Sequence, residues 1–272
     1  MRRALLLLPL LASTASAGII DGMKGKAIDD YTIQLEGRYW LATLNAEMMA
    51  DTSFLDGTDI DLDSDLGLDE TEQLWEVDAT LRVKTLLVHL AYTQAVFEND
   101  KTLSETISFE GHTFTVSDNV HSSVRLILGG LDLEYLLLDV GSGTSFGFEL
   151  GVGTGVRYLR FQGRIASEGT GWAEVADRDA WIPVISVYAS VAVVNILRVD
   201  LQVGGLKLPR IGGFRGMLID GSIEAKVFLH HLVYVGIGYR LLYLEADYEK
   251  GGNSVELNGR VGGFFGAVGV VF

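Results

Sequence analysis

The sequence predicts an all-β protein: a closed, antiparallel, up-and-down transmembrane β-barrel of about ten strands. Apolar and polar residues alternate along many segments, which is the pattern of strands with one apolar and one polar face. Gly occurs 33 times, whereas Pro occurs only at positions 183 and 209 after residue 17, and this composition suits long hydrogen-bonded strands. The net charge is −15 although 48% of the residues are hydrophobic. A barrel accommodates both by turning alternate apolar residues toward lipid.

Residues 1–17 predict a cleaved secretory signal peptide. Two arginines come first, residues 4–11 are apolar, and residues 15–17 form a small-residue cleavage site. The apolar run is too short for a membrane-spanning helix, which needs roughly 20 residues. Because no Cys follows the cleavage site, we expect no lipid anchor. We expect residues 18–30 to form a periplasmic leader and residues 31–272 to form the barrel.

The alternation is clearest in residues 74–84, where apolar side chains share one face and charged side chains share the other. A helical period of 3.6 residues would spread both sets around a cylinder, so the period of two predicts a strand. The predicted strands are residues 31–48, 74–84, 86–97, 121–138, 145–165, 180–194, 197–206, 217–228, 232–248 and 255–272. Eight or twelve strands also fit the pattern, because residues 106–116 form a further strand-like piece.

The segments that join the predicted strands are alternately long and short. Long loops on one side of the membrane and short turns on the other are typical of transmembrane barrels. An even number of strands also returns the end of the barrel to the side where it began. The predicted external loops lie near residues 49–73, 98–119, 166–179, 207–216 and 249–254.

The last predicted strand, residues 255–272, ends on an aromatic residue. Every second residue counted back from Phe272 to Phe264 is apolar or Gly, so this part of one strand face carries no charge. The ending resembles the closing strand of bacterial outer-membrane β-barrels, in which a terminal Phe belongs to the insertion signature. We assign to this signature Phe264, Val268, Val270 and Phe272.

The resemblance implies an integral outer-membrane protein that the barrel-assembly machinery folds and that contacts outer-membrane lipid and lipopolysaccharide. Arg260 is the exception on the apolar face, because strict alternation from Phe272 places it there. It must therefore lie above the bilayer, unless a bulge at residues 262–263 reverses the alternation.

The polar faces of the strands carry both signs of charge. A barrel of eight to ten strands encloses little more than side chains, so we expect these residues to pair and to plug the lumen. Such a lumen predicts a structural or adhesive role, or a path for a narrow solute, rather than a wide pore. The predicted lumen charge network comprises Glu36, Arg38, Glu76, Asp78, Arg82, Lys84, Asp132, Glu134, Glu149, Arg157, Arg198, Asp200, Glu224, Lys226 and Arg240.

Residues 51–72 carry nine acidic residues and no Lys or Arg. Four of them, Asp59, Asp61, Asp63 and Asp65, occupy every second position and would share one face of a strand. Calcium and magnesium take several such oxygens, but Leu66 stands where a twelve-residue calcium loop needs Gly. We expect a solvated acidic external loop, with these four residues as the candidates for Ca or Mg and with no other cofactor.

No motif predicts catalysis. The five histidines lack the spacing of a metal site on one strand face, and the absence of Cys excludes disulfides and thiolate chemistry. His121 and Ser122–Ser123 stand near Asp118, but short polar loops bring such residues together by chance. The acidic balance argues against a nucleic-acid partner, because phosphate binding needs a basic surface.

Two alternatives remain open. A soluble periplasmic β-barrel that binds an apolar ligand would turn its apolar residues inward and its charged rows outward. A lipid A-modifying or proteolytic outer-membrane enzyme would need a Ser/His or Asp/His site, and neither family's motif is present. The sequence predicts no particular oligomeric state.

Overall fold

The computed structural model describes residues 31–272, apart from 52–57, 69–70, 110, 142–145, 194–195, 212–213 and 251–252. The predicted signal peptide and leader, residues 1–30, lie outside the described residues. No helix in the described part of the chain is long and apolar enough to cross a membrane. The regular elements in this part are all β-strands.

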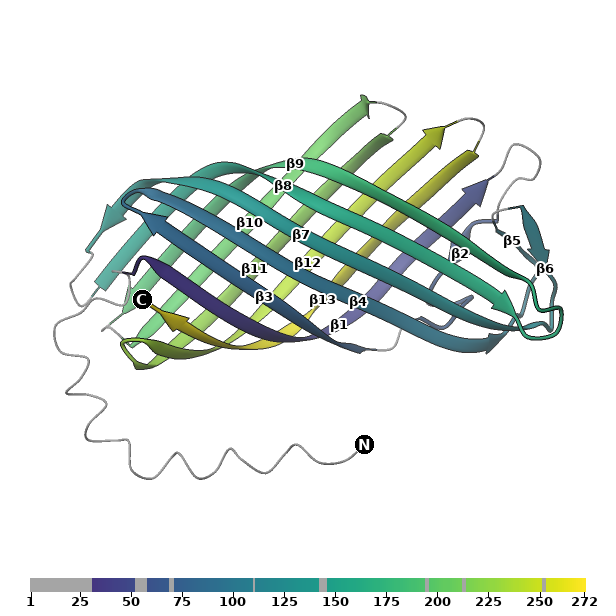
Figure 1. The fold of residues 1–272 in the computed structure, drawn as a ribbon, viewed down its shortest axis with the longest axis horizontal. Helices are drawn as coiled ribbons and strands as arrows, with labels where there is room; N and C mark the ends of the chain where they lie inside the picture. Colours follow the sequence, from purple (N-terminus) through teal and green to yellow (C-terminus); the bar gives the residue numbers. More distant parts are fainter. Residues whose placement is uncertain are drawn as a thin grey trace, which may run out of the picture.

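Ten long antiparallel strands form one sheet that returns to its first strand (Figure 1). They are β1 (Ile33–Asp51), β3 (Glu72–Val83), β4 (Leu86–Thr102), β7 (Asn119–Val140), β8 (Phe146–Ser167), β9 (Ala173–Val193), β10 (Leu197–Ile211), β11 (Phe214–His230), β12 (Val233–Lys250) and β13 (Asn253–Val271). Each pairs with the next, and β13 pairs with β1 from Gln34–Val271 to Asp51–Ser254. The predicted ten-stranded, antiparallel, up-and-down barrel is confirmed.

Three short strands lie in the connections, namely β2 (Ile60–Asp61), β5 (Ile107–Phe109) and β6 (His112–Phe114). They mark one end of the ring, which we name the loop end (Figure 1). The opposite end, the turn end, carries the start of β1, the end of β13 and tight turns such as the one between β3 and β4.

Several strands continue through residues predicted as loops at the loop end. Residues 98–102 belong to β4, residues 173–179 to β9 and residues 207–211 to β10. The alternation persists there with its faces exchanged, because the outward residues are polar and many inward residues are apolar. The predicted strand ends lie where charged residues interrupt the lipid-facing pattern. A strand that continues beyond the membrane produces the same interruption, so the sequence pattern does not distinguish it from a loop.

The outward side chains form an apolar belt around the ring. Trp75, Trp181, Ile237, Val268 and Phe272 are each between 61% and 69% exposed. In water, an uninterrupted exposed apolar surface of this kind is unfavourable. The belt is therefore the face that meets hydrocarbon, as the alternation predicts.

Aromatic pairs lie on the outward face toward the loop end of the belt. Tyr158 and Trp181 have ring centroids 4.9 Å apart, and Tyr239 and Phe264 have centroids 5.1 Å apart. Arg260 is exposed four residues beyond Phe264 toward the loop end. The pairing of β13 with β1 and with β12 shows no register shift, so no bulge intervenes and Arg260 lies beyond the belt.

The inner face has two zones. Charged side chains fill the lumen toward the turn end, and apolar side chains fill it toward the loop end. The prediction that apolar residues face outward holds for the belt and is wrong for the loop end, where the outer wall is polar. There the interior is an apolar core of the kind a water-soluble barrel has, formed by residues such as Leu44, Leu126, Phe161, Leu244 and Leu257.

Two inward glycines leave room for carboxylates. A Cβ atom on Gly155 would overlap Oδ1 of Asp132, and one on Gly236 would overlap Oε1 of Glu224. A narrow ring can hold long ionic side chains because some inward positions carry no side chain at all.

Replacing Gly155 with Ala should lower the free energy of unfolding by about 1–3 kcal/mol, because the added methyl group overpacks the lumen. Gly37→Ala is the matched control, since a Cβ atom there meets nothing within 4 Å. Urea unfolding in lipid vesicles, followed by tryptophan fluorescence, measures both. Equal stability of the two variants would contradict the close approach of Gly155 to Asp132.

Candidate functional site in the lumen

Arg38 is central to the charged network inside the ring. Its guanidinium donates hydrogen bonds to Glu76 Oε1 at 2.7 Å, to Glu224 Oε2 at 3.1 Å and to Glu36. Asp78 Oδ2 lies 4.0 Å from the same guanidinium nitrogen that bonds to Glu76. Since β1 and β11 are not neighbours in the sheet, Arg38 joins walls that strand pairing leaves apart.

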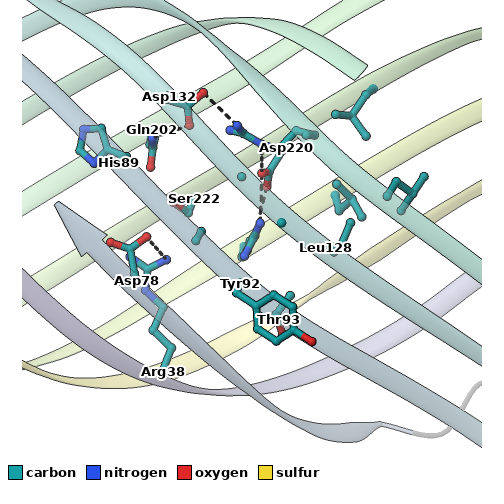
Figure 2. Close-up of a pocket in the computed structure, with 18 residues that line it drawn as sticks. Arg38, Asp78, His89, Tyr92, Thr93, Leu128, Asp132, Gln202, Asp220 and Ser222 are labelled. Carbon is teal, nitrogen blue, oxygen red and sulfur yellow. Dashed lines mark hydrogen bonds and ion pairs between the residues drawn. The ribbon is translucent and has the colours of Figure 1, made fainter. Parts of the chain in front are cut away.

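A second cluster continues the network toward β7 and β8 (Figure 2). Arg157 donates to Asp132 Oδ1 at 2.9 Å and to Asp220 Oδ2 at 3.0 Å. Arg240 donates twice to Asp220, at 3.0 Å each, and also to Glu76. Because Glu76 is shared with the first cluster, charges of alternating sign connect one side of the lumen to the other.

Toward the turn end, Lys226 and Arg198 hold the remaining acids. Lys226 Nζ lies 2.9 Å from Asp200 and 3.1 Å from Glu36. Arg198 donates to Asp200 Oδ1 at 2.7 Å and to the Tyr188 hydroxyl at 2.5 Å. These cations are among the most deeply buried side chains of the protein, with Arg198 1% and Lys226 2% exposed.

Two further groups complete the network. Arg82 bonds to Asp139 at 2.8 Å and to Glu149, near the turn end. His89 Nε2 lies 3.0 Å from Glu134 Oε2. Glu134 is fully buried, so this carboxyl lies in the lumen away from bulk water.

Lys84 is the predicted network member that the structure places elsewhere. It is exposed in the turn between β3 and β4, with a φ of 58°, because β3 ends one residue earlier and alternation no longer applies. The sequence prediction also omitted Asp220, although it shares a face with Glu224 at alternate positions. The buried hydroxyls of Tyr188 and Tyr234, which bond to Arg198 and Glu36, were not predicted either.

The network leaves little free space. Two cavities within it have volumes of about 30 Å³ each, one of them shown in Figure 2. A buried water needs roughly 10–15 Å³ on this measure, so each cavity has room for about two waters. Buried ions without partners would be strongly unfavourable, and in this lumen the opposite charges fill the space that a pore would use.

Residues 58–68, which we name the plug, complete the wall at the loop end and bury apolar side chains in the interior. Ile60, Leu62 and Leu66 are at most 1% exposed. The Leu62 amide donates to the Ala46 carbonyl at 2.9 Å, and Asn99 Nδ2 donates to the Leu66 carbonyl at 3.2 Å. The plug therefore occupies the space between β1 and β4 that the shorter β3 leaves open.

The conformation of the plug fixes the positions of the four candidate cation ligands. The carboxylate of Asp61 accepts hydrogen bonds from the amides of Asp63 and Ser64, and Asp65 accepts one from the amide of Asp61. Asp59, Asp61, Asp63 and Asp65 do not share a strand face, because the strand ends at Asp61 and the chain turns there to bury its leucines. Among the described residues, no group of three or more His, Cys, Asp or Glu is placed to hold a metal.

His121 is not hydrogen-bonded to Asp118 or Ser122, its near neighbours in the sequence. Its Nδ1 lies 2.6 Å from Asp100 on the neighbouring strand, whereas the Asp118 carboxylate accepts hydrogen bonds from Thr115. Ser122 is buried and points inward, on the opposite face of β7 from His121. His121, Ser122 and Asp118, which lie close together in the sequence, therefore do not form one site in the structure.

The terminal signature residues lie on the outer face of β13 and just beyond its end. Phe264, Val268 and Phe272 are between 61% and 66% exposed, within the apolar belt. The Phe272 amide donates to the Ile33 carbonyl at 2.8 Å, and its carbonyl accepts from Thr32 at 2.6 Å. The last residue thus completes the seam between the two ends of the barrel.

Pairing between β9 and β10 stops early. It runs from Leu197–Val193 to Gly205–Ile185, although β9 begins at Ala173 and β10 continues to Ile211. Beyond the Gly205–Ile185 pair the two strands diverge toward the loop end (Figure 1). The loop end therefore consists of two facing groups of strands, and the plug bridges them on the side away from β9 and β10.

Replacing Arg240 with Met should lower the free energy of unfolding by about 3–5 kcal/mol, because Asp220 and Glu76 lose a buried partner. Arg210→Met is the matched control: its guanidinium also bonds to two carboxylates, but it is 49% exposed and exposed ion pairs contribute little. Urea unfolding in vesicles compares them. A loss in Arg240→Met no larger than that in the control would contradict the buried network.

The fold resembles that of a solved outer-membrane protein. The outer-membrane protease OmpT of Escherichia coli matches with a TM-score of 0.50 at 10% identity, over 90% of this chain and 100% of OmpT. The translocator domain of the autotransporter NalP from Neisseria meningitidis has a TM-score of 0.37 at 11% identity, over 94% of this chain and 92% of that domain. No protein-family model and no curated protein matches the sequence. The chain is therefore similar to OmpT in fold, as a β-barrel of the outer-membrane type.

Proposed function

We propose that the protein is an integral outer-membrane barrel with a sealed lumen, which serves as a structural or adhesive element of the cell surface. The continuous charge network from Asp132 to Glu224 is the observation that carries this proposal. It occupies the lumen at the level of the apolar belt, where an open pore would need water. The apolar core at the loop end, to which the plug contributes its buried leucines, adds a second barrier.

The direction of insertion follows from the ends of the ring. The loop end faces the exterior and the turn end faces the periplasm, as in barrels with short periplasmic turns. The barrel-assembly machinery would act on the terminal strand, whose outward Phe264, Val268 and Phe272 are accessible before the seam forms. Outer-membrane lipid and lipopolysaccharide would surround the belt.

A role without catalysis accords with the site. Among the described residues, the His121–Asp100 pair lies on the outer wall and is open to solvent, with side chains 42% and 76% exposed. Catalytic electrostatics depend on preorganised groups in a water-excluded site. The protease activity of OmpT is not carried over to this chain on a likeness of fold.

The purified protein in planar lipid bilayers should show no stepwise single-channel current above the baseline. The double variant Asp220→Ala/Arg240→Ala removes one anion and one cation together, so it widens the lumen and preserves its charge balance. We expect this variant to pass small ions. Porin-like steps from the unaltered protein would overturn the sealed lumen.

The folded barrel should migrate differently on a detergent gel before and after boiling, because paired strands resist the detergent until they are heated. A soluble β-barrel with an apolar interior is expected to show no such resistance. Identical migration before and after boiling would count against membrane insertion, whatever the conductance experiment shows.

A further inference from the structure

The outer wall carries a recess beyond the apolar belt. It lies over β4, β7, β8 and β9 and has a volume of about 230 Å³. Arg125, Arg164 and Gln162 line it together with His121 and Ser123. All five side chains belong to the outward face, so the recess opens to the surroundings of the barrel rather than to its lumen.

Two guanidinium groups in this recess are unpaired. Arg125 and Arg164 are exposed, and the described residues provide neither with a hydrogen bond or an ion pair. Arg164 is opposite Ser123 in the sheet, two residues from Arg125 on β7. Such diagonal neighbours have Cα atoms about 7–8 Å apart, and long arginine side chains at this separation can converge on one anion.

Arg160, which lies next to the recess on the same outer wall, is an arginine whose charge is already paired. Arg160 donates to both oxygens of Asp177, at 3.0 and 2.6 Å. The hydrogen bond from Arg160 holds the pKa of Asp177 below its usual range. Arg125 and Arg164 are therefore available for an external anion, whereas Arg160 is already neutralised.

The distance of the recess from the apolar belt, measured along the membrane normal, indicates where that anion comes from. Along the outer face of β8, Tyr158 of the aromatic boundary is followed by Arg160, Gln162 and Arg164. At about 3.3 Å per residue and a strand tilt of about 40°, Arg164 stands roughly 15 Å beyond Tyr158. This is the level of sugars and phosphates in the outer leaflet, and the apolar belt for acyl chains continues directly below it on the same strands.

We propose that this recess binds the phosphorylated sugar headgroup of a lipopolysaccharide molecule. Arg125 and Arg164 bind a phosphate, because planar guanidinium groups match phosphate oxygens. Ser123 and the side-chain oxygen of Gln162 hydrogen-bond to sugar hydroxyls, since the Gln162 Nε2 already donates to Asp177 at 3.4 Å. Glu98, which also lines the recess, lies across Ser123 on β4 and accepts from hydroxyls rather than facing the phosphate. The inference rests on the proposed outer-membrane location.

A hydrolytic site is the competing interpretation of the same recess. His121 Nδ1 lies 2.6 Å from Asp100, and Ser123 shares its strand face. Nucleophilic activation requires the hydroxyl within hydrogen-bond reach of the base. The described structure records no hydrogen bond between Ser123 and His121, so it favours binding over cleavage.

The test uses the folded protein in detergent micelles, with folding of every sample first verified by the migration shift on boiling. Native mass spectrometry then measures the binding of short-chain lipopolysaccharide and of the same lipid after enzymatic removal of its phosphates. We expect phosphorylated lipid to bind at least about tenfold more tightly, as loss of a charge-assisted contact implies. Excess inorganic phosphate should not displace it.

The double variant Arg125→Gln/Arg164→Gln should weaken binding of phosphorylated lipid at least about tenfold. Arg215→Gln/Arg260→Gln is the matched control, because it removes the same charge from exposed residues of β11 and β13 and should change affinity less than about twofold. Equal weakening in both, no weakening in the first, equal binding of dephosphorylated lipid, or release of free acyl chains would overturn the inference. Because folding is verified separately, each of these outcomes leaves the proposed sealed barrel standing.

Discussion

Neutralisation of charge within a narrow ring is the constraint on which the rest of this structure depends. Ten strands enclose a lumen only as wide as a few side chains, and hydrocarbon surrounds it. Inward carboxylates are therefore stabilised by cations from other strands, as Glu76 is by Arg38 and Arg240. Glycines such as Gly155 follow from the same constraint, because two long side chains cannot share one level of the lumen if every position carries a Cβ atom.

The same strands meet two different solvents along their length. Within the belt, lipid lies outside and ions lie inside. Beyond the aromatic pairs, water lies outside, and the inward residues pack as an apolar core around Phe161 and Leu244. Alternation with a period of two is compatible with both arrangements, so a strand can cross from one to the other without a bulge, as β13 does at Arg260.

The sequence alone predicts the parts of this fold that depend on local alternation. The number of long strands, their antiparallel order, and the inward position of residues such as Arg38 and Lys226 follow from period-two patterns. The ion pairs between distant strands do not follow from these patterns, because they depend on strand tilt and on which strands approach each other across the lumen. The Arg157–Asp220 pair joins residues 63 positions apart, and no local pattern links them. The conformation of the plug cannot be predicted from local alternation either. Its alternating acidic residues resemble a strand, whereas burial of its leucines requires a turn.

The early end of pairing between β9 and β10 has a mechanical consequence. Beyond Gly205–Ile185 the strands no longer form a continuous hydrogen-bonded ring. Two groups of strands face each other there and are joined at the level of the belt. Local stability of a β-structure falls where ladder hydrogen bonds are missing, so we expect these two groups of strands to open more readily than the paired part of the ring below them. Any difference in strand tilt at the level of the belt therefore displaces the tips of these two groups of strands further than their bases.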